Sequence, residues 1–464
     1  MSPYFASLIL SFTALILQAG LTGAAPTSQQ WLKSCTSSNE RSEAVKGAFS
    51  HAYGGYKKYA WGHDELLPVT RNYSDSRNGW GATIVDALDT MLIMGFDDDY
   101  AEALKFVSTI DFSNSSQPAK GFETNIRYLG GLLSANDLRP DPILAKKAIE
   151  VTEAVLLPLF DSPSKAPYTD MDLNAGKPKK VSAIDLAEFG TYSLEFTRLS
   201  QITNNPKYAK FSNDLIDRAI SVPTEFPGLF PTTWTVNPFE PVDSSVITIG
   251  SGGDSFYEYL MKNYILLGGS DKKLLETWMD TVESTQKYLL SPTKQDPNVQ
   301  FVAMINDDTK LYQSDELICF WPGNIMLGTS QVQNNSNLIN FATTFMNACE
   351  TVWKDTATGI APETWTWSPK TKSETESLIK TEVAWDMFRA IHKYTRTAAG
   401  YSLINDVDDT STTKGNLQES FFLAETLKYL YLIFVDKDCV SLDEYVFNTE
   451  AHPFKLPHPI KAQH

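Results

Sequence analysis

The chain has 464 residues, of which 42% are hydrophobic and 12% aromatic, so it can bury a large core. Its formal net charge of −17 argues against nucleic acid and anionic membrane surfaces as partners, because both are negatively charged. A chain of this length could form two or three average domains, but helical barrels also reach it as one unit.

Residues 1–25 are predicted to be a secretory signal peptide. An apolar run from Phe5 to Leu17 is followed by small residues before Pro26. No Lys or Arg precedes Lys33, so an uncleaved anchor is the alternative. We favour cleavage, because several polar side chains interrupt the run and make it a poor membrane span. Residues 26–464 would then be one domain without stable membrane insertion, either secreted or retained in the ER or Golgi lumen.

Two further features agree with passage through the secretory pathway. Asn72, Asn114 and Asn334 each begin an N-glycosylation sequon, although three such matches could arise by chance. The four cysteines allow three pairings, among which the residues alone do not choose. Disulfides are favoured over free thiols in an oxidising compartment.

Apolar residues recur with helical spacing along almost the whole chain. Ile84, Val85, Leu88, Met91 and Leu92 lie at i, i+1, i+4, i+7 and i+8, which places them on one helical face. Similar patterns predict helices near 41–60, 97–109, 121–137, 142–157, 182–202, 206–220, 257–264, 270–290, 315–330, 337–353, 378–396 and 417–435. Helices joined by short polar breaks predict a helical toroid or bundle.

Two segments depart from this pattern. Val299 to Ile305 is the one clear strand-like run, followed by a possible turn at Asp307-Asp308. Pro158 to Pro178 is the longest irregular segment, and it is interpreted as a loop. No Gly-, Pro- or Ser-rich linker divides the chain.

Glu123 is the first candidate for an acid or base. Phe122 and Ile126 place its carboxyl beside apolar surface, which is expected to raise its pKa, as a general acid requires. The simpler interpretation is an i, i+4 ion pair with Arg127 on a helix face.

Asp254 and Glu363 are the next two candidates. Asp254 follows a glycine-rich turn, and Ser255 with Glu258 has the spacing of a helix capping box, so Asp254 could simply favour the positive end of a helix. Glu363 alone would pass for a loop carboxylate.

The C-terminal stretch Phe447-Asn448-Thr449-Glu450-Ala451-His452-Pro453 resembles the closing signature of the class I α-1,2-mannosidases, glycoside hydrolase family 47. Further blocks at 79–91, 121–131, 254–260 and 361–363 resemble the same family and occur in its order. The resemblance runs from about Ala48 to Pro453. It implies an all-α fold, an (α/α)7 barrel closed by a C-terminal β-hairpin.

The resemblance also implies roles for particular residues. Glu123 would be the acid, Asp254 would position or activate water, and Glu363 would be a further catalytic candidate. The residues implied to line the sugar subsite are Arg127, Glu188, Glu419 and Glu450; each carboxylate among them could instead be a helix-end or ion-pair residue. Thr449 would supply calcium ligands, and Cys319 would pair with Cys349. Cys35 and Cys439 could form a second disulfide between the chain ends, and Asp86 and Asp89 are assigned to structure.

Two departures from the family pattern stand out. Glu316 occupies a position where relatives have a pocket His, so sugar contacts there are expected to differ. The family's Arg-Pro-Glu block, whose Glu is usually assigned as the base, does not occur in the chain. Either Glu374 or Glu376 is a remnant of that base, or a whole segment is missing through a deletion or an incorrect gene model. We favour a missing segment, which would leave the barrel short of one helix.

The reaction implied by the resemblance is inverting hydrolysis of terminal α-1,2-linked mannose on high-mannose N-glycans by a monomer that uses Ca²⁺. Oxygen ligands such as those of Thr449 suit this ion, whereas the six histidines show no zinc-ligand spacing. The alternative is a catalytically silent protein that binds mannose glycans but lacks the base. A helical-barrel glycosidase for another sugar is disfavoured by the C-terminal block.

Overall fold

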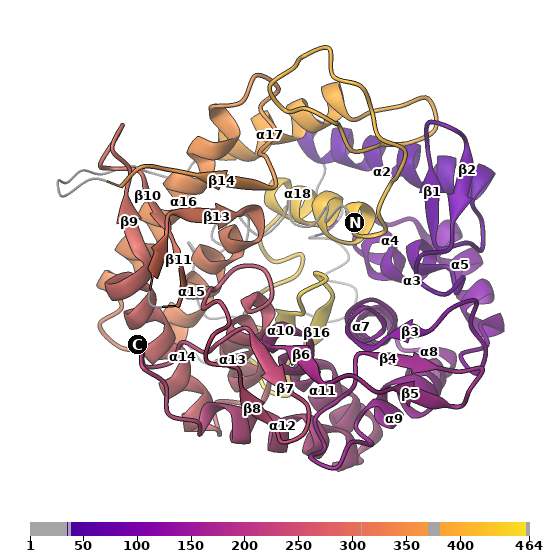
Figure 1. The fold of residues 1–464 in the computed structure, drawn as a ribbon. Helices are drawn as coiled ribbons and strands as arrows, with labels where there is room; N and C mark the ends of the chain where they lie inside the picture. The colour runs from indigo at the N-terminus through magenta and orange to yellow at the C-terminus, as the bar shows by residue number, and fades with distance from the viewer. Residues whose placement is uncertain (1–34, 36–38, 308, 370–380, 461–464) are drawn as a thin grey trace.

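Helices form two concentric rings around a central axis in the computed structural model, which describes residues 35, 39–307, 309–369 and 381–460 (Figure 1). The outer ring consists of α5 (Asp97–Thr109), α8 (Pro142–Val151), α12 (Lys207–Ile220), α14 (Lys272–Ser284), α16 (Ser336–Lys354), α17 (Thr381–Tyr394) and α2 (Glu40–Tyr59). The inner ring consists of α3 (Ala82–Asp86) with α4 (Leu88–Met94), α6 (Gly121–Glu123) with η2 (Thr124–Leu129) and α7 (Gly130–Leu138), α10 (Leu186–Gly190) with α11 (Ser193–Thr203), α13 (Asp254–Leu266), η5 (Glu316–Phe320) with α15 (Trp321–Gly328), and η7 (Phe422–Thr426) with α18 (Leu427–Phe434). The rings confirm the predicted (α/α)7 architecture.

The outer helices follow directly from the sequence. In α14, Leu274, Trp278 and Val282 repeat at intervals of four residues and are all buried, while the side chain of Asp271 caps the helix by accepting from the Lys273 N–H. Such spacing gives an outer helix one apolar face, which packs on the inner ring. The core lies between the two rings.

Helical hairpins are the repeating unit of the barrel. The inner helices α4, α7, α11, α13 and α15 each pack on the outer helix that follows in the chain, and α18 packs on α2, which closes the ring. The outer helix α17 is different, because the described residues between α16 and α17 contain no inner helix, only the strand β14 (Thr364–Thr366). Residues 370–380, which fall in this interval, lie outside the described residues, so the shortage of one helix stays a prediction for this inner position.

A cavity of about 310 Å³ lies at that position. Its walls come from α16, α17, the loop 401–407 and the start of the α18 segment, with Trp353, Ile391, Ile404 and Phe421 among the lining residues. The candidates for a remnant base, Glu374 and Glu376, lie outside the described residues.

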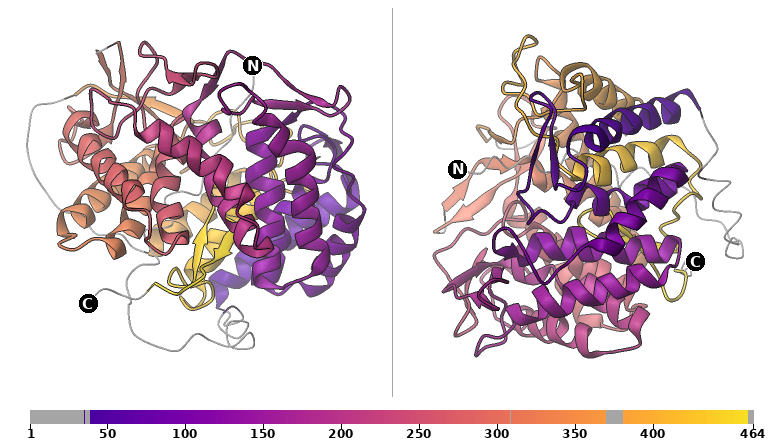
Figure 2. Two further views of the ribbon diagram at one scale, coloured as in Figure 1. Left: turned by 90° about the horizontal axis from the view of Figure 1, so that it is seen from below. Right: turned by 90° about the vertical axis from the view of Figure 1, so that its right-hand side faces the viewer.

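The C-terminal hairpin fills the centre of the barrel. The strands β15 (Tyr445–Phe447) and β16 (Pro453–Lys455) pair antiparallel, and the hairpin enters the ring of inner helices from one end (Figure 2). A Cβ atom on Gly130 would lie 2.5 Å from the Asn448 side chain, so only glycine leaves room for the hairpin turn there. The predicted hairpin closure is confirmed.

Replacing Gly130 with alanine is expected to destabilise the fold by about 1 to 3 kcal/mol, because the new methyl group would push the hairpin turn away from α7. The matched control is Gly54→Ala on α2, where an added Cβ meets no atom within 4 Å. That control is expected to stabilise the helix by about 0.5 to 1 kcal/mol. Denaturant unfolding of both variants measures the difference, and equal effects would contradict this account of Gly130.

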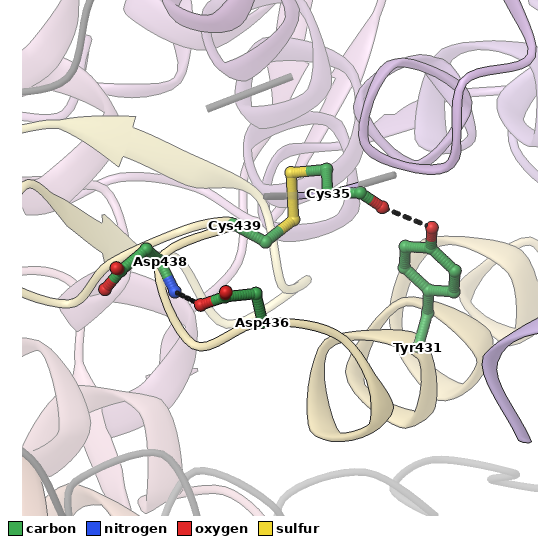
Figure 3. The surroundings of a disulfide bond; sticks show 5 residues. All are labelled: Cys35, Tyr431, Asp436, Asp438 and Cys439. Atoms are coloured by element: carbon green, nitrogen blue, oxygen red, sulfur yellow. Dashed lines mark hydrogen bonds between the residues drawn. A yellow bond between two sulfur atoms is a disulfide. The ribbon is translucent and has the colours of Figure 1, made fainter. Parts of the chain in front are cut away.

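Both predicted disulfides are present. Cys319 in η5 bonds to Cys349 in α16, and Cys35 bonds to Cys439 across a separation of 404 residues. Figure 3 shows the second bond beside Tyr431, whose hydroxyl donates to the Cys35 carbonyl oxygen at 2.5 Å. This bond ties the N-terminal end of the described chain to the segment that leads into the hairpin.

The strands were largely missed by the sequence prediction. The run Val299 to Ile305 does form β10 (Gln300–Val302) and β11 (Met304–Asn306), but further short strands occur in the loops. The segment Pro158 to Pro178, predicted to be a loop, contains β4 (Asp170–Asp172) and the start of β5 (Lys177–Lys179). The remaining strands are β1 (Glu65–Leu67), β2 (Asn72–Ser74), β3 (Ala119–Lys120), β6 (Ala183–Asp185), β7 (Thr233–Thr235), β8 (Glu240–Pro241), β9 (Leu290–Pro292), β12 (Thr309–Leu311) and β13 (Gln313–Asp315).

Surface features bear on the secretory predictions. The sequon residues Asn72, Asn114 and Asn334 are all exposed, as attachment of a glycan requires. Within the described ranges, no helix has the length and apolar character needed to cross a membrane. The predicted signal, residues 1–25, lies outside those ranges.

Candidate active site

Arg127 lies at the centre of a buried group of carboxylates. It sits on η2, a π-helical turn within the inner helix, and is 5% exposed. Its Nε donates to Glu123 Oε2 at 2.8 Å, while its Nη1 lies 3.4 Å from Asp86 Oδ2 and contacts the Glu450 carboxylate. The guanidinium therefore connects the barrel wall to the C-terminal hairpin, and the predicted pair of Glu123 with Arg127 is confirmed.

Glu123 has a second guanidinium beside it. Arg77 Nη1 lies 3.4 Å from Glu123 Oε1, and Arg77 Nη2 lies 3.8 Å from Glu419 Oε2. Burial alone would raise the pKa of the Glu123 carboxyl, but the two guanidiniums outweigh it and hold the pKa below its usual value. The expectation of a raised pKa was therefore wrong, because the cations matter more than the apolar neighbours Phe122 and Ile126.

Sequence patterns gave no signal for Arg77, which lies in an irregular loop. That loop is fixed by the buried carboxylate of Asp64, which accepts from the backbone N–H groups of Arg77 at 2.8 Å and Gly79 at 2.7 Å. Gly79 adopts a φ of +74°, a conformation that favours glycine. The turn aims the Arg77 side chain at Glu123 and Glu419.

Thr449 is held at the tip of the hairpin, close to the inner ends of α11 and α13. Its N–H donates to the Tyr259 hydroxyl at 3.2 Å, and that hydroxyl donates to Glu195 Oε1 at 2.7 Å. Asn448 Nδ2 also donates to Glu195 Oε1, at 2.9 Å. This chain of hydrogen bonds sets the position of Thr449 from the barrel wall.

The oxygen atoms of Thr449 fit the chemistry of a calcium ligand. The residue is half-buried, and its hydroxyl and carbonyl are hard oxygen donors of the kind that Ca²⁺ prefers. No group of three or more His, Cys, Asp or Glu residues in the described part of the chain has the geometry of a metal site. An ion at Thr449 would thus depend on water and ligand oxygens for its other contacts.

Glu195 leads to a testable pH dependence. Burial raises the pKa of its carboxyl to about 7, although Tyr259 and Asn448 donate to it. The unfolded chain releases this proton near pH 4.3. The folded protein binds more protons between those values, so its stability falls as the pH rises through the interval.

We expect the free energy of unfolding to fall by about 2 to 4 kcal/mol from this group alone between pH 5 and pH 8. Glu195→Gln, which keeps an acceptor for Tyr259 but cannot ionise, should show a flatter profile. Urea unfolding at several pH values measures both proteins. Identical pH profiles would show that Glu195 ionises normally in the folded state.

Asp254 begins α13 and lies near Asp315. Burial and the neighbouring Asp315 carboxylate raise the pKa of the Asp254 carboxyl to about 7, although it accepts from the Ser255 N–H at 2.7 Å. The predicted capping box of Ser255 and Glu258 is wrong: the helix starts one residue earlier without a side-chain cap, and Glu258 forms a buried ion pair with Lys262. A carboxyl that titrates near neutral pH can exchange a proton with water.

Glu363 and Glu316 lie together because two short strands pair. Asp315 of β13 is in register with Thr364 of β14, and the Glu316 N–H donates to the Glu363 carbonyl oxygen at 2.9 Å. Burial and the Glu363 carboxylate raise the pKa of Glu316, while burial raises the pKa of Glu363 to about 7. Both residues line the cavity that α16 and α17 border.

Glu188 and Glu419 are both partly exposed. Burial and Asp185 raise the pKa of Glu188 to about 7, and burial with Glu65 raises that of Glu419 to about 8. The predicted helix 417–435 includes Glu419, but in the structure Glu419 lies before η7 and outside any helix. Its contact with Arg77 connects it to the group around Arg127.

Asp86 and Asp89 form a fully buried ionic group with the hairpin and α18. The His452 ring contacts both carboxylates, with Nδ1 2.7 Å from Asp89 Oδ2, and Lys428 Nζ lies 2.7 Å from Asp89 Oδ1. Lys428 and His452 lower the pKa of Asp89 to about 2 despite its burial. These contacts support the structural role assigned to the two aspartates.

The candidate residues thus fall into connected parts. Contacts join Glu123, Arg127, Glu419 and Glu450, and Thr449 adjoins Glu450 in the hairpin turn. The charge of Asp315 raises the pKa of both Asp254 and Glu363. Glu188 lies elsewhere on the inner ring, and its charge interactions are with Asp185, Lys120 and Asp170.

Comparisons with known proteins agree with this arrangement. The family model "Glycosyl hydrolase family 47" matches residues 48–383 and 375–456, so the match divides between residues 375 and 383. The chain is 34% identical to mannosyl-oligosaccharide alpha-1,2-mannosidase 1B of Aspergillus phoenicis, covering 97% of this chain and 99% of the relative. That alignment runs over 509 residues, more than the chain contains, so the relative has segments without a counterpart here.

Two further relatives extend the comparison. Mannosyl-oligosaccharide 1,2-alpha-mannosidase MNS1 of Arabidopsis thaliana is 38% identical over 90% of this chain and 79% of its own length. Among solved structures, an alpha-1,2-mannosidase from Trichoderma reesei superposes with a TM-score of 0.84 at 30% identity, covering 90% of this chain and 99% of that one. The likeness therefore extends over the barrel as a whole.

Proposed function

The chain belongs to glycosyl hydrolase family 47, and from this premise we propose that it removes terminal α-1,2-linked mannose from high-mannose N-glycans by calcium-dependent, inverting hydrolysis. The observation that carries the proposal is the connected group of Glu123, Arg127 and Glu450 beside Thr449. It brings a candidate acid and a candidate calcium ligand to the closed end of one barrel. Membership of the family implies glycosidase activity.

Each side chain has a separate task in this proposal. Glu123 is the candidate for donating the proton to the leaving oxygen, and Arg127 and Arg77 hold its carboxyl in place through contacts of 2.8 and 3.4 Å. Because these guanidiniums also lower the pKa of Glu123, the role requires that the carboxyl gain its proton when the glycan binds. Asp254 and Glu363, each with a pKa near 7, are the candidates for accepting a proton from water. Glu188, Glu419 and Glu450 supply hydrogen-bond acceptors to sugar hydroxyls.

Calcium would be held by the hydroxyl and carbonyl of Thr449 together with water and sugar oxygens. The bound ion would fix the hydroxyls of the terminal mannose at the closed end of the barrel. The hydrogen bonds from Thr449 through Tyr259 to Glu195 keep that position rigid. The protein is expected to act as a monomer in the secretory pathway after its signal is cleaved.

A second candidate is a mannose-glycan-binding protein without turnover. It is favoured by one observation: the family's Arg-Pro-Glu block does not occur in the sequence, and the described residues between α16 and α17 form no inner helix. In this case Thr449, Arg127 and the sugar-lining carboxylates would still bind a glycan.

Incubation of the purified protein with a high-mannose N-glycan, followed by mass spectrometry, separates the two candidates. We expect successive losses of one hexose, which a chelator abolishes and added calcium restores. Calcium should also raise the unfolding temperature, because it binds the folded state. A folded protein that binds calcium and glycan but releases no hexose would instead be the silent binding protein.

A further inference from the structure

The backbone places two carboxyl groups opposite each other at the edge of the candidate site. Leu66 of β1 and Gln418 form an isolated antiparallel bridge, in which the Gln418 N–H donates to the Leu66 carbonyl oxygen at 3.0 Å. Continuing this register by one residue along each segment pairs Glu65 with Glu419. Residues that face each other across an antiparallel pair have Cβ atoms only about 5 Å apart, and like charges at such positions are destabilising.

Both carboxyls of this pair are withdrawn from water and short of hydrogen-bond donors. Glu65 is 1% exposed, and the side chain of Glu419 is 12% exposed. The Ser76 hydroxyl donates to Glu65 Oε2 at 2.6 Å, but Glu65 Oε1 and Glu419 Oε2 are buried and accept no hydrogen bond from the described part of the chain. Two such oxygens can satisfy each other only if one carboxyl keeps its proton and donates it to the other.

The charges around the pair do not compensate for ionisation of both carboxyls. The charged groups that act on Glu419 are Glu65 on β1, Arg77 on the loop before α3, and Arg127 on η2. Arg77 also faces Glu123, so this one guanidinium lies among three carboxyls. Burial and Glu65 raise the pKa of Glu419 to about 8 despite the two arginines. The pair therefore holds one proton at neutral pH.

We propose that Glu65 is a positioning residue for the glycan site: its carboxyl shares one proton with Glu419, and this hydrogen bond holds the Glu419 carboxyl where it contacts a bound mannose. The inference rests on the proposed function, which supplies the glycan. A ligand can reach Glu419, because its side chain is partly exposed and lines the cavity that α16 and α17 border. Loss of the shared proton would leave two carboxylates facing each other and would push the Glu419 side chain out of place.

The test compares the wild type with Glu65→Gln by titration with a high-mannose glycan between pH 6.5 and pH 9, with calcium present. The amide of the variant can accept from Ser76 and donate to Glu419, but it does not titrate. If only the protonated pair binds the glycan, the wild-type dissociation constant should rise about tenfold more than that of the variant over this range. Groups other than the pair contribute to both proteins alike.

Glu65→Ala separates the hydrogen bond from other effects of the substitution. This variant removes the donor to Glu419, so it should bind the glycan about tenfold more weakly than the wild type at pH 6.5. Glu65→Gln should bind nearly as well as the wild type at that pH. Circular dichroism reports folding, and if Glu65→Ala does not fold, the profile of Glu65→Gln still decides.

A second readout does not need the glycan. The unfolded chain releases the proton of a glutamate near pH 4.3, whereas the folded pair keeps one up to about pH 8. The stability of the wild type should therefore fall as the pH rises between these values, and that of Glu65→Gln should fall less. Urea unfolding measures both profiles. The matched control is Glu276→Gln, at an exposed position on α14, which should keep the wild-type profiles of stability and of glycan affinity.

Parallel pH profiles of glycan affinity in the wild type and Glu65→Gln would overturn the inference and leave the proposed function intact. A folded Glu65→Gln protein that binds the glycan as poorly as Glu65→Ala at pH 6.5 would also overturn it, since the hydrogen bond alone would then not position Glu419. Coinciding unfolding profiles would show that the pair shares no proton. If none of the proteins binds the glycan, the proposed function and the role of Glu65 both fail.

Discussion

Replacing Glu123 with glutamine is expected to lower the rate of hexose release by roughly 10²- to 10⁴-fold, the usual loss when a general acid is removed. The amide oxygen can still accept from Arg127 Nε, which now lies 2.8 Å from the carboxylate, so the local fold should persist. Mass spectrometry of the released hexoses measures the rate, and titration with the glycan measures binding.

The control for this variant is Glu276→Gln, at an exposed position on α14 far along the chain from any candidate residue. It should retain the wild-type rate. A Glu123→Gln protein that released hexose at the wild-type rate would remove Glu123 from the mechanism. If its glycan affinity fell in parallel with its rate, Glu123 would be a binding group rather than the acid.

Replacing Lys428 with methionine is expected to destabilise the protein by about 3 to 5 kcal/mol. The Lys428 side chain is fully buried, its Nζ lies 2.7 Å from Asp89 Oδ1, and it donates to the Ala451 carbonyl at 2.7 Å. Removal of one partner leaves a buried charge uncompensated, which is the costly way to break an ion pair. The hairpin turn would lose an anchor at the same time.

Denaturant unfolding of Lys428→Met measures this cost against Lys273→Met. The control removes an exposed pair, Lys273 with Asp217 at 3.9 Å, and should change stability by less than about 1 kcal/mol. Similar effects from both substitutions would show that solvent reaches the group around Asp89. Calcium-dependent stabilisation should also weaken in Lys428→Met, since Ala451 is two residues from Thr449.

The helices could be predicted closely because an amphipathic helix repeats its pattern over several turns. The predicted segment 97–109 coincides with α5, and 270–290 contains α14 and the turn that follows it. The strands could not be predicted in the same way, since each is only two or three residues long, too short for an alternating pattern to be recognised. Their positions depend on which loops the barrel brings together, as for β13 and β14.

For the candidate site, prediction from the sequence has a different limit. Motif blocks indicated that Glu123, Glu419 and Glu450 belong together, although Glu123 precedes the other two by about 300 residues, and their contacts with two arginines agree. The pKa of Glu123 could not be predicted from the residues next to it in the sequence. Arg77 lowers the pKa of Glu123 from a loop 46 positions away. Glu195 was missed because its partners, Tyr259 and Asn448, come from distant segments.

The bond between Cys35 and Cys439 makes the barrel a covalent ring, because nearly all of its helices lie between these two cysteines. One proteolytic cut in any loop of that ring would leave a single molecule, in which Glu123 and Thr449 remain covalently connected, either along the chain or through the disulfide. Such a nicked protein would run as one band on a non-reducing gel and as two bands after reduction. The ring therefore allows the barrel to survive a first cleavage without losing a piece.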